Sequence, residues 1–570
     1  MLGVRTFLIV RETLRVSSSC TCQLSHSVTQ PVTHSVSNSV TRFVPSASIR
    51  MSSSESCRNY ENAIDKLMSL QSVAATVKTS EKESKSQQFS VRNSNVAVTR
   101  TYLDRLGVTT EDLDALKIIH VAGTKGKGST CALTESILRN CGYSTGFTSS
   151  PHLMEVRERI RLNGKVMSRE LFSHYFHELW DKFEQCEVPD TESVPPGLPG
   201  YVPPKFPSFL KYIVVMAYYV FIKEKVDVAV VEVGLGGRYD CTNLIEHPTL
   251  TAVTHLGFDH CSILGHTIEE IAGEKSGIIK QGVPVYTVPQ HYTASYPVLE
   301  QHARNMGTSV IRVPPLSHYP NPPSLTSETW SDNISLALQL AKRWLDCNIN
   351  QNTNTECQLN GEELTTDIGK AAPFEIPEPF LRGIRTCQWP GRNHVIQRDR
   401  VTYYLDGAHT PVSIGLCSRW FKSHTSDSRR KVLLVNTRGE RQLSDFLDII
   451  RRDIRVDLLI FCPNIASNNV VVKDCEWPED LKKSMVEKAR LNKEEWCDTG
   501  SGTPALFFSS VEEGVEHIEK TSNNTETDVL ITGSLHLIGS ALQVLHPTFL
   551  DDGEREVLKS GAQLIQSAEV

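Results

Sequence analysis

The chain has 570 residues, of which 39% are hydrophobic and 22% charged, and its formal net charge at pH 7 is −7. This composition is typical of folded proteins and excludes fibrous and wholly disordered classes. The negative charge argues against a general nucleic-acid binder, so a polyanionic ligand would have to be held by local basic groups. The 15 cysteines lack metal-binding spacing and predict mostly reduced thiols of an intracellular protein.

The longest apolar run, Ile213–Ile222, is bounded by Lys211 and Lys223. It has only about half of the roughly 20 residues that a membrane-spanning helix needs. The sequence therefore predicts a buried helix here and no integral membrane segment.

Residues 1–50 contain five arginines, one acidic residue and many serines and threonines. This composition is typical of a mitochondrial transit peptide, and a disordered tail without a targeting function is the alternative. Met51 follows this segment directly, and translation that starts at Met51 would give a second, cytosolic form. The expected locations are the mitochondrion, in the matrix or associated with the inner membrane, and the cytoplasm.

Helix and strand patterns alternate from about residue 103 onward. Val226–Val233 (VDVAVVEV) is a near-continuous β-branched run of the kind found in a parallel sheet that is covered on both faces. Val188–Pro207 predicts a proline-rich surface loop, and Asp346–Thr366 predicts a polar insertion or linker. The other elements expected in this half are helices at Leu103–Leu116, Ser129–Asn140, Thr267–Lys280 and Asn333–Leu345, and strands at Lys117–Ala122, Thr145–Thr148, Leu250–His255 and Val283–Val288.

The segment Ile118–Thr130 reads IIHVAGTKGKGST, an apolar strand that runs into a glycine-rich turn and then into a helix start. Backbone N–H groups of residues 126–129 would converge on phosphate oxygens, and the helix dipole and the Lys127 ammonium favour an anion. Ser129 or Thr130 would then face a magnesium ion. The match to the standard phosphate loop is partial, because one extra glycine separates Lys127 from Ser129. An ordinary glycine turn is the alternative, but the pattern favours nucleotide binding.

Polar residues follow several of the predicted strands, and ligands of parallel sheets bind beyond the carboxyl ends of the strands. Ser150 follows the strand at Thr145–Thr148, Glu232 ends the β-branched run, and Asp259 and His260 follow the strand at Leu250–His255. A hydroxyl, a carboxylate and an imidazole are reasonable magnesium ligands beside a triphosphate. Each residue alone could be a turn residue, a salt-bridge partner or a core histidine. Together, they predict a site.

The helix expected at Thr267–Lys280 opens with a Thr-x-x-Glu capping box. Lys275 lies four residues after Ile271 and seven after Ile268, so it shares their inward stripe. A lysine on an apolar face tends to lose its proton, and the neutral amine reacts with carbon dioxide or with a phosphorylated group. The alternative is a lysine whose ammonium reaches water or an ion-pair partner.

A second α/β unit follows, with strands expected near Val401–Leu405, Lys431–Val435, Asp457–Phe461 and Asp528–Thr532. The predicted fold is therefore α/β, with an N-terminal phosphate-loop ATPase domain built on a mostly parallel sheet and a C-terminal Rossmann-like domain. The predicted boundaries are a transit peptide at 1–50, an ATP-binding domain at 59–385 and the C-terminal domain at 386–570.

Near the start of this second unit, the motifs at 389–392 (WPGR) and 405–409 (LDGAH) place an arginine, an aspartate and a histidine. Arginine suits bidentate phosphate contact, and aspartate suits a ribose hydroxyl or an adenine edge. The second domain could use them to close over ATP held by the first. A domain-interface ion pair is the alternative.

These motifs, in this order, resemble the folylpolyglutamate synthase family, which belongs among the Mur-type ATP-dependent amide ligases. The resemblance covers about residues 59–547, and GTKGKGSTC and the long leader look more like the eukaryotic members than like the bacterial bifunctional ones. The motifs that carry it are GTKGKGS, FTSSPHLMEVRERIRLNG, VDVAVVEVGLGGRYDCTN, LGFDHCSILGHTIEEIAGEKSGI, WPGR, YYLDGAHT and TGSLHL.

The resemblance implies a ligase reaction. ATP would activate the γ-carboxylate of a folate glutamate as an acyl phosphate, and the amine of L-glutamate would displace the phosphate. It also implies Mg²⁺ and a monovalent cation such as K⁺ as cofactors. The expected partners are folate, L-glutamate and ATP, with no nucleic acid, and the chain is expected to be a monomer.

The family pattern carries over to individual residues. It assigns Gly126, Lys127, Gly128 and Ser129 to the ATP phosphates, Ser150, Glu232 and His260 to magnesium, and Arg392, Asp406 and His409 to ATP across the domain seam. Lys275 matches the lysine that family members carbamylate to hold a second metal, and Asn333 matches a position near the adenine. The expected catalytic residues are Lys127, Lys275 and His260. Asn436–Arg441 resembles the family's Gly-Asp-Arg turn but has Glu440 where aspartate is usual.

Three alternatives share this ATP site. The chain could be a bifunctional dihydrofolate synthase, a Mur-type ligase for another amino acid, or a catalytically inactive nucleotide-binding regulator. Retention of Lys127, Glu232, His260 and Lys275 together argues against the inactive regulator.

Overall fold

The structure is a computed structural model. It describes residues 58–78, 94–187, 202–325, 327–351, 369–437, 443–468, 479–498 and 502–551. The predicted transit peptide and Met51 lie outside the described residues.

The first sheet has nine strands in the described residues, in the order β4-β3-β2-β5-β1-β6-β7-β8-β9. Neighbouring strands pair in parallel from β2 to β9, while β3 pairs antiparallel with both β2 and β4. Its strands are β1 Ile119–Ala122, β2 Thr145–Thr148, β3 Ile160–Leu162, β4 Lys165–Val166, β5 Val228–Glu232, β6 Leu250–Val253, β7 Val285–Thr287, β8 Val310–Arg312 and β9 Gly369–Lys370.

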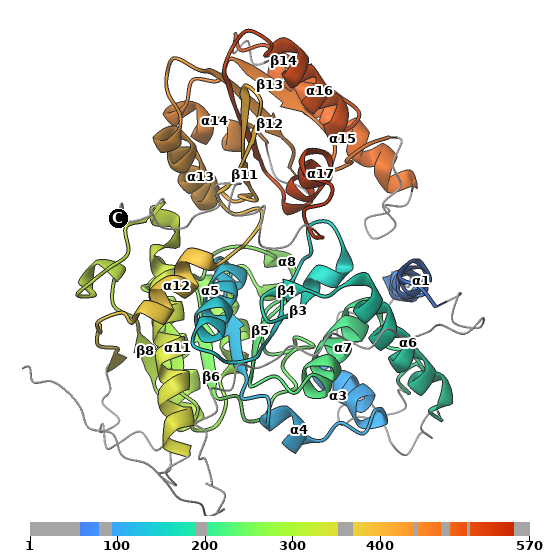
Figure 1. Cartoon of the computed structure of the whole chain (residues 1–570), viewed down its shortest axis with the longest axis vertical. Helices are drawn as coiled ribbons and strands as arrows, with labels where there is room; N and C mark the ends of the chain where they lie inside the picture. The colour runs from blue at the N-terminus through green and yellow to red at the C-terminus, as the bar shows by residue number, and fades with distance from the viewer. Residues whose placement is uncertain are drawn as a thin grey trace, which may run out of the picture. The chain divides into compact units, whose positions relative to one another are not determined.

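Helices cover both faces of this sheet, as the β-branched run predicts (Figure 1). Side chains of β5 alternate between two apolar clusters: Ala229 and Val231 pack with α1, α3, α6 and α7, whereas Val228 and Val230 pack with α5, α11 and α12. All five residues of β5 are buried. The helices of this half are α1 Tyr60–Lys78, α3 Asn95–Arg105, α4 Thr110–Asp114, α5 Lys127–Asn140, α6 Arg169–Gln185, α7 Phe209–Lys223, α8 Cys261–Leu264, α9 Ile268–Lys275, α10 Ser295–Asn305, α11 Ser331–Gln351 and α12 Glu378–Thr386.

The second sheet has the order β10-β11-β15-β12-β13-β14 within the described part of the chain. It is parallel except for β10, which pairs antiparallel with β11. Its strands are β10 His394–Arg398, β11 Val401–Asp406, β12 Arg430–Val435, β13 Leu458–Phe461, β14 Ala505–Phe507 and β15 Thr527–Thr532, and its helices are α13 Pro411–His424, α14 Leu443–Asp453, α15 Glu479–Asp498, α16 Val511–Thr521 and α17 Leu535–Leu545. The two mostly parallel sheets with covering helices confirm the predicted α/β class.

Two helix predictions are wrong in their extent. The helix expected at Leu103–Leu116 is broken, because Gly107 adopts φ +72° and Thr109 then caps a new helix, α4, through a capping box with Asp112. The helix expected at Thr267–Lys280 ends at Lys275 and continues as a 3₁₀ turn over Ser276–Ile278.

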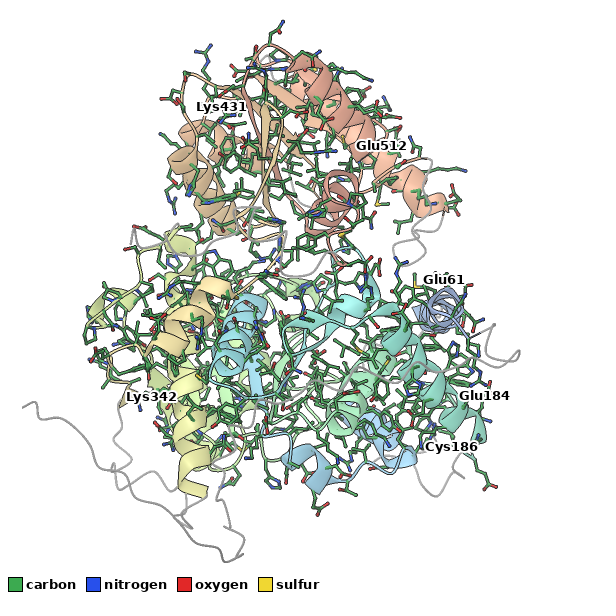
Figure 2. The ribbon with its side chains drawn as sticks, viewed as in Figure 1. Glu61, Glu184, Cys186, Lys342, Lys431 and Glu512 are labelled. Carbon is green, nitrogen blue, oxygen red and sulfur yellow. The ribbon has the colours of Figure 1, made fainter. Side chains whose placement is uncertain are left out.

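Parts of the two segments expected to be a surface loop, Val188–Pro207, and an insertion, Asp346–Thr366, belong to the packed fold. Helix α11 continues to Gln351, beyond the predicted end at Leu345. Lys342, which Figure 2 labels on this helix, forms an i,i+4 ion pair of 2.7 Å with Asp346. The end of the proline-rich segment packs inward, since Phe206 stacks on Trp180 with ring centroids 4.2 Å apart. Residues 188–201 and 352–368 lie outside the described residues.

The apolar run at Ile213–Ile222 lies within α7, whose side chains are mostly buried in the core. In the part of the chain that the structure describes, no helix has the length and apolar character needed to cross a membrane.

Candidate active site

The glycine-rich turn connects β1 to α5, as the sequence predicts. The N–H groups of Thr124 and Lys125 donate to the carbonyl oxygen of His255 at 2.8 and 3.1 Å, which ties the turn to the end of β6. Gly126 follows with φ +90° and is the N-cap of α5, whose first residue is Lys127. Because the first N–H groups of a helix have no partner within the helix, this end of α5 suits a phosphate.

Two close approaches explain why glycine is needed in this turn. A Cβ atom on Gly126 would overlap Oδ1 of Asn333, which also accepts a hydrogen bond of 3.3 Å from the Thr130 hydroxyl. A Cβ on Gly128 would lie 2.7 Å from the Trp389 ring and 3.2 Å from Oε2 of Glu232. Asn333, predicted near the adenine, therefore lies against the phosphate loop.

Ser150 and Glu232 lie together beside this loop. The Ser150 N–H donates to Oε2 of Glu232 at 3.1 Å, and the Glu232 side chain is buried. Burial raises the pKa of Glu232, while the Lys127 ammonium, the Ser150 N–H and the Arg392 guanidinium oppose that rise. The carboxylate is thus surrounded by groups that favour its charged form, and a divalent cation would favour it further.

His260 is more exposed than the other predicted magnesium ligands. It caps α8 with φ +53°, and its side chain is 57% exposed. Partial burial lowers its pKa, and the nearby ammonium groups of Lys275, Lys125 and Lys127 lower it further, although Asp259 raises it. A lowered pKa favours the neutral imidazole, which is the form that can bind a metal.

The donor chemistry fits a magnesium ion that shares its shell with phosphate oxygens and water. A hydroxyl, a carboxylate and a neutral imidazole leave several positions for such oxygens. Within the described ranges, no group of three or more histidine, cysteine, aspartate and glutamate side chains is arranged to hold a metal by itself. The structure brings Ser150 and Glu232 together through the hydrogen bond of 3.1 Å, and binding of magnesium by Ser150, Glu232 and His260 stays a prediction.

Lys275 is buried, as its position on the inward stripe predicts. Its Nζ donates to the carbonyl oxygen of Gly123, at the start of the glycine-rich turn, at 2.9 Å. Burial, together with repulsion from Lys127, lowers the pKa of Lys275 to about 7. A substantial share of these amines is therefore neutral near physiological pH and able to act as a nucleophile.

Lys125, Asp259 and His409 form a cluster that the sequence prediction did not assemble. Nζ of Lys125 lies 2.9 Å from Oδ2 of Asp259 and 2.6 Å from Nε2 of His409. Nδ1 of His409 lies 2.8 Å from the carbonyl oxygen of Gly407, and its Nε2 lies 3.6 Å from Oδ2 of Asp259, so each ring nitrogen faces an oxygen acceptor. The cluster joins the phosphate loop to the loop after β11.

The charges of this cluster depend on one another. Burial lowers the pKa of Lys125 to about 8, although Asp259 opposes that change. Burial alone would raise the pKa of Asp259, but the contacts with His409 and Lys125 hold it well below its usual range. The sequence signals for the cluster are the first lysine of GTKGKGS, the carboxylate directly before His260 and the histidine of the LDGAH motif, but nothing in the sequence shows that the three meet.

Asp406 and Arg392 organise the loops at the start of the second sheet. The two carboxylate oxygens of Asp406 accept hydrogen bonds of 2.9 Å from the N–H groups of Asn393 and Ala408. Burial raises the pKa of Asp406, and the Arg392 guanidinium opposes this. Arg392 itself donates to the carbonyl oxygen of Gly391 at 3.0 Å. Both carboxylate oxygens of Asp406 already accept hydrogen bonds from backbone N–H groups. A contact of Asp406 with ATP stays a prediction.

The turn at Asn436–Arg441 is only partly described. Asn436 and Thr437 are buried after β12, and Nδ2 of Asn436 donates to Oδ1 of Asn464 at 3.2 Å. The residues that depart from the family pattern, Glu440 and its neighbours at 438–441, lie outside the described residues.

The sequence of the chain is similar to those of known enzymes. The chain matches no protein-family model. It is 35% identical over 560 residues to the mitochondrial folylpolyglutamate synthase of Cricetulus griseus, and the match covers 86% of this chain and 92% of that protein. The chain belongs to the folylpolyglutamate synthase family.

Solved structures of folylpolyglutamate synthases share its fold. The Mycobacterium tuberculosis enzyme complexed with ADP and AMPPCP has a TM-score of 0.59 at 21% identity and covers 79% of this chain and 95% of its own. An AMPPCP and folate complex has a TM-score of 0.59 at 21% identity and covers 86% of this chain and 100% of its own. The resemblance of the motifs to the folylpolyglutamate synthase family, and the fold it implies, are thus confirmed.

Proposed function

We propose that this chain catalyses the ATP-dependent addition of L-glutamate, through its amine, to the γ-carboxylate of a tetrahydrofolate glutamate. The products are a folate with one more γ-linked glutamate, ADP and phosphate. The observation that carries the proposal is the match to a folylpolyglutamate synthase over most of both chains. The names of the solved complexes, which hold ADP, an ATP analogue or folate, support ATP and folate as substrates.

In the first step, a carboxylate oxygen of the folate attacks the γ-phosphorus of ATP, and ADP leaves. Both partners are anions, so the reaction needs positive charge at the phosphates. The N-terminal end of α5 and the Lys127 ammonium are proposed to bind and orient them, and Arg392 is proposed to contact ATP from the second unit. Ser150, Glu232 and His260 would hold Mg²⁺, which when bound neutralises charge on the phosphate oxygens.

In the second step, the neutral amine of L-glutamate attacks the acyl carbon, the phosphate leaves, and the nitrogen loses a proton. The acyl phosphate would hydrolyse in a wet site, so water must be excluded. Trp389 lies over the loop at Gly128 and packs on Phe147 with ring centroids 5.5 Å apart. This apolar cover supports a proposed role in keeping water from the phosphates.

The proposal also covers the domain boundaries of the chain. The two sheets, at 119–370 and 394–532, support domains at 59–385 and 386–570 with a seam near Thr386.

Lys275 is proposed to become carbamylated and to hold a second cation. The mitochondrial name of the relative supports a mitochondrial location, and we propose that initiation at Met51 yields a cytoplasmic form. The enzyme is proposed to act as a monomer.

The decisive experiment incubates the purified chain with ATP, Mg²⁺, tetrahydrofolate and labelled L-glutamate. We expect label to enter a folate product with ADP formed in equal amount, and no incorporation of labelled aspartate or alanine. Incorporation of another amino acid instead would identify a different Mur-type ligase, and acceptance of dihydropteroate would identify a bifunctional enzyme. ATP turnover that needs neither folate nor glutamate, or no turnover at all, would contradict the proposal.

A further inference from the structure

The loop that follows β2 connects two parts of the proposed site. Its beginning carries Ser150, whose N–H donates to Glu232 at 3.1 Å. A few residues later, Met154 is buried among side chains of the second α/β unit, including Leu405 and Ile538, and Leu153 packs against the same cluster. A loop of the first sheet therefore supplies side chains to the core of the second unit.

Two glycines permit a very close approach to Leu153. Gly539 lies in α17, and a Cβ atom there would fall far inside contact distance of the Leu153 carbonyl oxygen. Gly391 has φ +73°, and a Cβ there would lie 2.9 Å from Ile538 and 3.3 Å from the Leu153 side chain. Leu153 is thus held between α17 and the residue that directly precedes Arg392.

The backbone around Leu153 is fixed by buried charged groups. The Glu158 carboxylate accepts hydrogen bonds from the N–H groups of residues 153, 154 and 155 at 3.3, 2.6 and 2.8 Å. Arg157, which is almost fully buried, donates to Glu155 at 2.5 Å and to Asp551, beyond α17, at 2.7 Å. The segment is therefore fixed to the second unit both by apolar packing and by an ion pair.

We propose that Leu153 is a positioning residue of the ligase reaction. Seated against Gly539 and Gly391, it fixes the distance between Ser150, which contacts the proposed metal carboxylate, and Arg392, which is proposed to contact ATP. The inference rests on the proposed function. It predicts that a small displacement of Leu153 weakens the binding of the magnesium–nucleotide complex, although neither Leu153 nor Gly539 is among the residues proposed to bind the nucleotide.

The test compares three variants of the full chain by calorimetric titration with AMPPCP and Mg²⁺. Gly539→Ala displaces the Leu153 backbone, and Leu153→Ala removes the side chain. Both are expected to raise the Kd by about tenfold, the size of effect expected when one hydrogen bond to a charged phosphate is lost. Leu153→Met, which conserves volume, should restore most of the affinity. KM for ATP should rise in parallel with Kd.

Gly415→Ala is the matched control, because Gly415 is a buried helical glycine of the same unit whose Cβ would meet only ordinary contacts at 3.5 Å or more. It should leave Kd unchanged. If Gly539→Ala fails to fold, the comparison of Leu153→Ala with Leu153→Met decides. Activity that falls only in proportion to the folded fraction, with Kd and KM unchanged, would overturn the inference. A wild-type chain that binds AMPPCP but makes no folate product would contradict the proposed function and leave the binding test intact.

Discussion

Lys275 offers the sharpest test of the chemistry, because its burial sets its charge. With a pKa of about 7, about three quarters of the amines are neutral at pH 7.5, against about one in a thousand for an exposed lysine. The structure thus makes the amine several hundred times more available to carbon dioxide. A carbamate formed there would turn a cation into an anion that can bind a metal.

We expect Lys275→Ala to lose most activity, with partial rescue by acetate, which can occupy the vacated space as a carboxylate. Lys275→Arg should fare no better than alanine, because a guanidinium stays protonated and cannot carry a carbamate. The assay is glutamate incorporation at pH 7.5 with and without bicarbonate, after removal of dissolved carbon dioxide. Wild-type activity should fall as the pH drops through about 7, since the protonated amine is not a nucleophile.

Near-normal activity of Lys275→Arg would refute this reasoning, because the residue would then act only as a cation. Lys422→Ala is a suitable control: Lys422 lies in the last turn of α13, away from the phosphate loop in sequence, and its side chain is exposed. Its activity and its response to bicarbonate should match those of the wild type.

Four further outcomes are expected. Lys127→Ala should lower turnover by orders of magnitude at saturating ATP without loss of fold, measured by steady-state kinetics and circular dichroism. Glu232→Gln should shift the Mg²⁺ titration of activity to much higher concentration, since an amide is a poorer ligand, and an unshifted curve would remove Glu232 from the metal site. Residues 1–50 fused to a reporter should direct it to mitochondria, whereas a chain that starts at Met51 should stay cytosolic and active; a diffuse signal from the fusion would contradict the targeting prediction. Burial, with a contribution from His546, lowers the pKa of His394 to about 4, so stability should decrease as the pH falls from about 6.5 toward 4; relative to His394→Phe, urea unfolding should show about 2 kcal/mol lost between pH 7.5 and 5.

Elements with a strong local pattern could be predicted from the sequence. The β-branched run gave β5, buried on both faces, and the capping box of Thr267 with Glu270 is present at the start of α9. The inward position of Lys275 followed from its spacing to Ile271. In these cases the periodicity of the segment itself specifies its environment.

Other elements are specified by contacts that the sequence does not show. Strands β8 and β9 have only three and two residues and are held by pairing with their neighbours. The break at Gly107 interrupts a pattern that otherwise reads as one helix. Lys125 and His409 are 284 residues apart, and only the packing of the loop after β11 against the phosphate loop brings them together.

Lys125, Lys127 and Lys275 lie around the phosphate loop, and their surroundings reduce the repulsion between their ammonium groups. Three ammonium groups close together would destabilise the fold before any anion binds. The structure places Lys125 at 2.9 Å from Asp259, which neutralises its charge locally, and it buries Lys275 so that the pKa falls to about 7. Lys127 lies at the first position of α5, and we propose that it binds the phosphates together with the helix dipole. One lysine is thus paired with a carboxylate and one has a lowered pKa. Lys127 is the lysine that we propose binds the nucleotide, so the region of the glycine-rich turn could serve both phosphate binding and the chemistry proposed for Lys275.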